Sequence, residues 1–121
     1  MKILTHAEWM MLHTRNIEDY IERKITAKVF QANFFKWWAE AEETEGEKEM
    51  AEFYIMHDLF YDIEEFCIYP HLRKEGAINE KGLHKVACSI LKRLKEFEKT
   101  QDIEKVHRES ETYENWQKGG L

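Results

Sequence analysis

Two pairs of cysteine and histidine residues flank a turn-like stretch of this 121-residue sequence. Cys67 and His71 precede the stretch, and His84 and Cys88 follow it, and the members of each pair are four positions apart. On a helix this spacing puts both side chains on one face. Two antiparallel helices joined at residues 74–82 would therefore bring the four side chains to matching levels. Thiols and imidazoles are metal ligands, and zinc in a tetrahedral site is the ion that such a set would bind.

A second set of candidate ligands is spread over four helical stretches. His57 and Glu64 lie on one seam of the second stretch, where a buried imidazole and carboxylate are costly unless they are paired or coordinated. An apolar stripe on the same stretch is the alternative core face, which would leave this polar seam at its edge. When helical turns are counted from the loops, His57 and Glu64 lie at about the same height along the bundle as candidate ligands on the other stretches. We expect a metal site formed by His13, His57, Glu64, His84, His107 and Glu111, with Cys67, His71 and Cys88 as the alternative metal site.

Helix-breaking segments divide the chain into four stretches with helical periodicity, over residues 5–43, 47–72, 80–99 and 102–117. Thr5 and Glu8 form a capping-box pattern at the start of the first stretch. A helix over 5–43 would be about 58 Å long, so we expect it to break near residues 14–16 or at Thr26. Short connections force neighbouring helices to be antiparallel. The sequence therefore predicts an all-α fold, an antiparallel up-down four-helix bundle forming a single domain over 1–121.

Composition excludes several classes of function. The chain is 43% hydrophobic and 35% charged, with a formal net charge of −6 and no block of Lys and Arg, so we expect no nucleic-acid partner. No apolar run approaches the roughly 20 residues of a membrane-spanning helix, so we expect no membrane partner. The N-terminus does not resemble a signal peptide. We expect a cytoplasmic protein, and whether it is an enzyme stays open.

The segment from Ile63 to Leu72, followed by a Gly-containing loop and His84, resembles the hemerythrin-like (HHE cation-binding) domain family over residues 57–94. This resemblance implies a four-helix bundle that holds two non-haem iron ions for dioxygen binding, sensing or iron handling, with dioxygen or a small ligand at the metal. Phe60 stands where the family has a His, which implies a degenerate member. Ferritin-like di-iron bundles fit less well, because Glu104-x-x-His107 alone matches their Glu-x-x-His pattern.

An aromatic run at residues 34–38 covers too much of a helix circumference to be buried within one bundle. Phe34 and Trp38 share the core stripe, so Trp37 or Phe35 should point outward. Exposed aromatic side chains of this size are typical of protein-binding surfaces, and we expect a homodimer through Trp37 and Phe35. The alternative function is therefore a metal-free helical interaction or dimerisation module. The charge-rich residues 40–52 are interpreted as a solvated helix end and turn.

Overall fold

The computed structural model describes residues 3–66 and 77–119, and the regular elements within these ranges are six helices. They are α1 (His6–Ile21), α2 (Ala27–Trp38), α3 (Glu47–Glu65), α4 (Glu80–Thr100), α5 (Ile103–Glu109) and α6 (Glu111–Gln117). The all-α prediction is confirmed, whereas the four-helix bundle is not, and the single domain stays a prediction. Within the described ranges no helix combines the length and apolarity needed to cross a bilayer.

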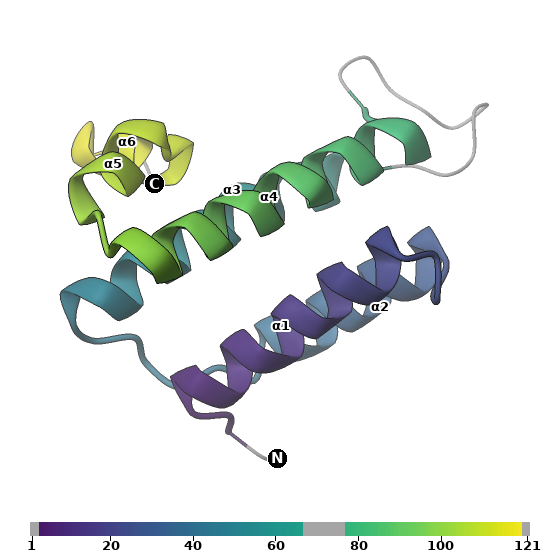
Figure 1. Cartoon of the computed structure of the whole chain (residues 1–121), viewed down its shortest axis with the longest axis horizontal. Coiled ribbons are helices and arrows are strands. Elements are labelled where there is room, and N and C mark those ends of the chain that lie inside the picture. The colour runs from purple at the N-terminus through teal and green to yellow at the C-terminus, as the bar shows by residue number, and fades with distance from the viewer. Residues whose placement is uncertain (1–2, 67–76, 120–121) are drawn as a thin grey trace.

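The long helices form two antiparallel hairpins that stack on each other (Figure 1). α1 pairs with α2, α3 pairs with α4, and α1 also packs against α4. The two short helices α5 and α6 lie beyond the end of α4 and pack on α3. The segment between α2 and α3 therefore lies at the same end of the molecule as α5 and α6 (Figure 1).

The first predicted helix breaks just before Thr26, which is the N-cap of α2. Arg23 has a φ of 62°, a left-handed conformation that ends the preceding helix. The Thr26 hydroxyl then accepts a hydrogen bond from the Val29 backbone N–H at 3.2 Å, as expected for an N-cap. The alternative break at residues 14–16 is wrong, because these residues lie inside α1 and the Asn16 amide there donates to the Phe30 carbonyl at 3.1 Å.

The fourth predicted helix, over residues 102–117, is divided at Ser110. The backbone of this residue is extended, with φ −86° and ψ 119°, so it ends α5 and caps α6 at the same point. Its hydroxyl oxygen accepts a hydrogen bond from the Tyr113 N–H at 3.1 Å. Serine favours such caps because its side chain replaces a missing backbone partner. The two resulting helices have seven residues each.

The core lies between the two hairpins, and the third predicted stretch faces it as expected. The inward residues of α4 are all buried, namely Leu83, Ala87, Ile90, Leu94 and Phe97. On α3 the apolar stripe of Met56, Leu59 and Ile63 is completely buried. That stripe, rather than the polar seam, is the core face, since Glu64 is exposed and His57 lies at the boundary.

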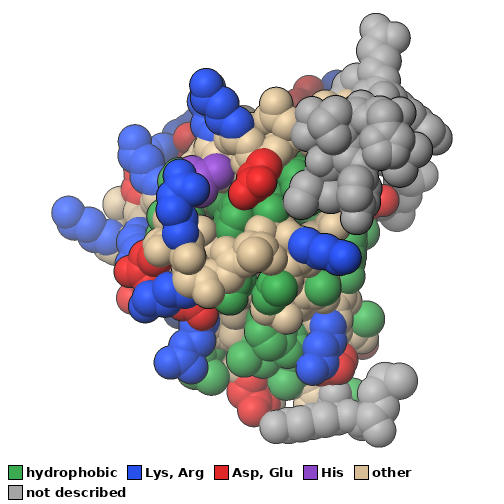
Figure 2. All heavy atoms as spheres, turned by 90° about the vertical axis from the view of Figure 1, so that its right-hand side faces the viewer, with side chains coloured by type: hydrophobic (Ala, Val, Ile, Leu, Met, Phe, Trp, Pro, Cys, Tyr) green, Lys and Arg blue, Asp and Glu red, His purple; other side chains and the backbone are tan. Residues whose placement is uncertain are grey.

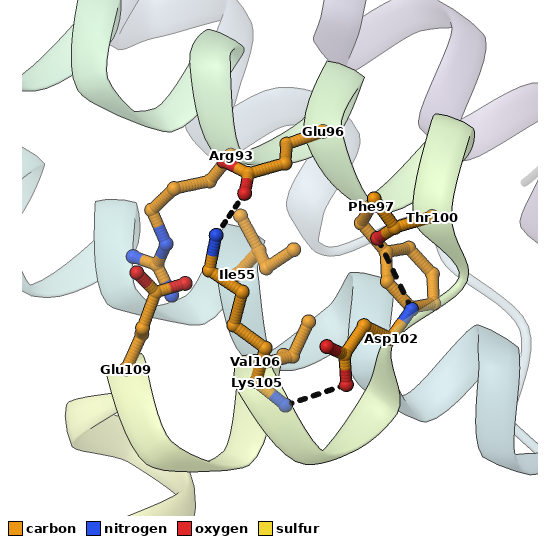
Figure 3. Close-up of a pocket in the computed structure, with 9 residues that line it drawn as sticks. All are labelled: Ile55, Arg93, Glu96, Phe97, Thr100, Asp102, Lys105, Val106 and Glu109. Carbon is orange, nitrogen blue, oxygen red and sulfur yellow. Dashed lines mark hydrogen bonds and ion pairs between the residues drawn. The ribbon is translucent and has the colours of Figure 1, made fainter.

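The corner between α4 and α5 is closed by polar contacts (Figure 3). The Asp102 carboxylate accepts from the Lys105 N–H at 3.1 Å, and the Asp102 N–H donates to the Thr100 hydroxyl at 3.2 Å. The Lys105 ammonium group forms an ion pair with Glu96 across the corner. The space left among these side chains is about 10 Å³, which is room for a single water molecule. This corner therefore positions α5 and does not offer a ligand site.

Candidate functional site

His13, a predicted metal ligand, is completely buried in an aromatic environment. Its ring centroid lies 4.7 Å from that of Trp9 and 4.9 Å from that of Phe34. Neither of its ring nitrogens has a hydrogen-bond partner. Burial lowers the pKa of His13 to about 3, because the charged form cannot be solvated there. The side chain is thus a neutral part of the core at neutral pH.

The other predicted ligands are not brought together. Glu64 and Glu111 are both exposed to solvent, so Glu64 does not point into the interior. The imidazole of His57 lies 3.1 Å from the Thr112 hydroxyl, and that of His84 lies 3.4 Å from the Ile21 carbonyl. Across residues 3–66 and 77–119, no group of three or more His, Cys, Asp or Glu side chains could hold a metal ion.

The cysteine–histidine quartet is described only on its second side. Cys88 is exposed, and its sulfur lies 3.8 Å from the Nδ1 atom of His84, as their spacing on α4 predicts. Cys67 and His71 lie outside the described residues. The zinc site that the four residues would form therefore stays a prediction.

Asp58, a residue that the sequence did not single out, forms a buried clamp between α3 and the two short helices. One carboxylate oxygen accepts hydrogen bonds from the Ser110 hydroxyl at 3.0 Å, the Thr112 N–H at 2.9 Å and the Thr112 hydroxyl at 2.8 Å. The other oxygen forms an ion pair with Arg93 of α4 at 2.8 Å. Because the carboxylate is only 9% exposed, these contacts satisfy it in place of water. The clamp fixes the α5–α6 junction on α3.

Next to this clamp is a groove of about 810 Å³. One wall is formed by the start of α3 and the segment before it, and the other by α5 and the start of α6. Met50 and Ile103 contribute apolar surface to the groove, and Tyr54, His107 and Tyr113 contribute rings. It is thus built by two parts of the chain that are about 50 residues apart in sequence.

The three rings in the groove contact one another in a fixed arrangement. His107 and Tyr113 are stacked, with centroids 3.9 Å apart and planes 2° apart. Tyr54 presents an edge-on contact to each of them, at 5.8 Å and 5.4 Å. Burial raises the pKa of Tyr54, so its phenol stays protonated at neutral pH. The two edge-on contacts of Tyr54 have the T-shaped geometry that aromatic side chains prefer.

Carboxylates surround the groove because an acidic segment, residues 40–52, borders it. This acidic segment has seven Glu and one Lys, a net charge of −6, and the rest of the chain has 17 acidic and 17 basic residues. The whole formal net charge of the chain is therefore concentrated in 13 residues. Glu45 and Glu47 of the acidic segment line the groove, and Glu104 of α5 lines its other wall.

The opposite end of the molecule carries side chains of both charges. Figure 2 looks at the end where α4 begins, and there Lys and Arg side chains are more prominent than Asp and Glu. The acidic segment lies at the far end, beside α5 and α6 (Figure 1). This separation gives the molecule one negatively charged end, at which the groove opens.

Sequence reasoning missed both the clamp and the groove. The interpretation of residues 40–52 as a solvated helix end and turn agrees with the exposure of Glu42, Glu43, Glu45 and Glu47. It overlooked that the net charge of this segment equals that of the entire chain. This sum could have identified the acidic end. No local pattern identifies Asp58 or Tyr54, because their partners come from α4, α5 and α6.

A family model described as bacterial self-protective colicin-like immunity matches residues 10–94, more than half of the chain. No curated protein and no solved structure gives a significant match. The matched family is helical but differs from the hemerythrin-like domains, so the resemblance seen in residues 57–94 is wrong. The predicted iron and oxygen-binding function loses its basis with it, and no cluster in the described residues supports that function. The match favours the alternative expectation of a helical interaction module. It covers α2 and α3 completely and most of α1 and α4, and it ends before α5 and α6.

Proposed function

Because the chain belongs to the bacterial self-protective colicin-like immunity family, we propose that it binds and neutralises the nuclease domain of a colicin-like toxin made by the same cell. The binding surface would be the acidic end of the molecule, formed by the acidic segment and the groove. The observation that carries this proposal is the family match together with the concentration of the whole net charge in residues 40–52.

Electrostatics supports a nuclease domain as the partner. A nuclease must attract the phosphate backbone of its substrate, so its substrate-binding surface is positively charged. An inhibitor with a negatively charged end is complementary to that surface and competes with nucleic acid for it. Such complementarity mainly increases the association rate and suppresses binding to wrong partners. Rapid association suits an immunity protein, because free toxin would damage the cell that makes it.

A row of partly exposed aromatic rings begins at Tyr54 in the groove and runs along α3 to α2, and it forms a surface suited to protein binding. Ring contacts connect Phe35 to Phe60 at 5.8 Å, Phe60 to His57 at 5.2 Å, His57 to Trp116 at 5.9 Å and Trp116 to Tyr54 at 5.6 Å. Tyr and Trp are enriched among the residues that dominate binding energy at protein interfaces. Phe35 is 38% exposed, as expected from the sequence, while the homodimer through Trp37 and Phe35 stays a prediction.

The proposal is tested by assaying the nuclease activity of the purified toxin domain of the producing strain. We expect one equivalent of the chain to abolish cleavage of nucleic acid, and the association rate to fall as the salt concentration rises. Full nuclease activity in the presence of a large excess of the folded chain would show that the proposal is wrong.

A charge-matched pair of variants locates the surface. Glu43→Gln with Glu45→Gln removes two charges from the acidic segment, and we expect the association rate to fall about tenfold at low salt. Glu22→Gln with Glu64→Gln removes two exposed charges elsewhere on the helices. Equal association rates for the two double variants would exclude the acidic segment as the contact.

A further inference from the structure

The groove at the acidic end combines two features that a positively charged planar group needs. It has aromatic surfaces from Tyr54, His107 and Tyr113, and it has carboxylates from Glu45, Glu47 and Glu104. Tyr54 packs against the edge of the core, whereas His107, Tyr113 and the three carboxylates are not part of it.

Within residues 3–66 and 77–119, the carboxylates of the groove have no cation of their own. Glu45, Glu47 and Glu104 are exposed, and none of them forms an ion pair with a Lys or Arg of the described residues. By contrast, the neighbouring Glu96 is paired with Lys105, and Glu52 lies 3.1 Å from the His6 imidazole. The groove thus keeps three negative charges available to a partner.

The rings of the groove select for shape as well as charge. A cation placed over an aromatic face is attracted by the quadrupole of the ring. The guanidinium group of arginine is planar, stacks on aromatic faces and donates to carboxylates in a bidentate geometry, whereas the lysine ammonium group is a compact, strongly hydrated charge. The apolar surface of Met50 and Ile103 can cover the methylene stem of such a side chain.

We propose that the groove binds an arginine side chain of the partner protein, with the guanidinium against the rings and its N–H groups donating to the rim carboxylates. This inference rests on the proposed function for its choice of a protein partner. It also assigns a role to α5 and α6, which lie outside the family match: they supply Glu104, His107 and Tyr113.

The test uses a small probe, so that it does not depend on the toxin. N-acetyl-arginine methylamide is titrated into the full chain, and the ring resonances of Tyr54, His107 and Tyr113 are followed by NMR. The corresponding citrulline and lysine derivatives serve as comparison probes. We expect saturable shifts with the arginine probe and none with the citrulline probe, which has the same shape without the charge. Equal shifts with citrulline, equal affinity for the lysine probe, or no shift with arginine would each overturn the proposal.

Two variants on α5 provide a matched control. Glu104→Gln removes a carboxylate of the groove, and we expect it to weaken binding of the arginine probe at least threefold. Glu109→Gln makes the same change on the same helix but outside the groove, and we expect no effect on probe binding. If the probe binds but the toxin domain is not inhibited, the proposed function fails and the arginine site stands. If the toxin is inhibited and the probe does not bind, the reverse holds.

Discussion

Replacement of Asp58 by Asn tests whether a buried carboxylate holds α5 and α6 on the long helices. The carboxylate accepts three hydrogen bonds from Ser110 and Thr112 and is paired with Arg93. Asn is nearly the same size, but it is neutral and presents an NH₂ group at one of the two oxygen positions. That NH₂ group must face either the donors of Ser110 and Thr112 or the guanidinium of Arg93, so one set of donors loses its acceptor.

The expected loss of stability follows from the burial of this pair. Breaking a buried ion pair by removing one partner costs roughly 3–5 kcal/mol. The Arg93 side chain is 18% exposed, so water compensates part of the loss, and we take about 3 kcal/mol. The entropy of unfolding for a chain of this length is about 250 cal/mol/K, so the midpoint of thermal unfolding should fall by about 12 °C.

Two measurements check this prediction, namely thermal unfolding and amide hydrogen exchange. The Thr112 N–H donates directly to Asp58, so we expect its protection to fall more than that of Ile90 in the core of α4. Asp62→Asn is the control, since it makes the same change one helical turn away. Burial and the nearby Glu111 carboxylate raise the pKa of Asp62, so loss of its charge should not destabilise the chain at neutral pH. If Asp58→Asn unfolds within about 0.5 kcal/mol of the parent and Thr112 exchanges as before, the clamp is not what holds the short helices.

Three further predictions concern single residues. The pKa of His13 is about 3 in the folded chain against 6.5 in the unfolded one, so only the unfolded state takes up this proton as the pH falls below 6.5. The contribution of His13 to stability is therefore complete above pH 6.5 and is lost toward pH 3, by about 3 kcal/mol at pH 4.5. Urea unfolding of the parent and of His13→Leu should show this difference in pH dependence. Burial and the Glu80 carboxylate raise the pKa of Tyr20 to about 12, and the difference in absorbance between the parent and Tyr20→Phe during an alkaline titration should place this ionisation. Thr26→Ala removes the N-cap of α2 and should cost about 1 kcal/mol in urea unfolding, with an unchanged value showing that the cap is not needed.

Much of the helical structure could be predicted from the sequence because its signals are local. The capping box of Thr5 and Glu8 begins α1 as expected, and Asp102 caps α5. The apolar period of α4 identified its buried face. The division at Ser110 could not be predicted, because the periodicity continues through it. What breaks the helix there is a contact with Asp58, a residue 52 positions earlier.

The predicted metal ligands lie apart in the described part of the chain for a physical reason that their spacing in the sequence cannot reveal. The sequence pattern of a histidine on a core stripe is the same whether the side chain coordinates a metal or packs as a neutral ring. In the structure His13 packs against Trp9 and Phe34. Glu64 has the spacing of a seam residue, but the neighbouring apolar stripe faces the core and turns Glu64 to solvent. Sequence spacing fixes which residues share a helix face, whereas the choice of the buried face depends on the other helices.

The clamp and the groove are linked, because the rings of the groove depend on helices that are too short to be stable alone. Helices of seven residues are marginal in water, so α5 and α6 must take their positions from tertiary contacts. Asp58 supplies such contacts at the junction between them, and His107 and Tyr113 lie on either side of that junction. Asp58→Asn should therefore weaken binding of the arginine probe although Asp58 does not line the groove. Unchanged probe affinity in a variant with lost Thr112 protection would show that the groove forms without the clamp.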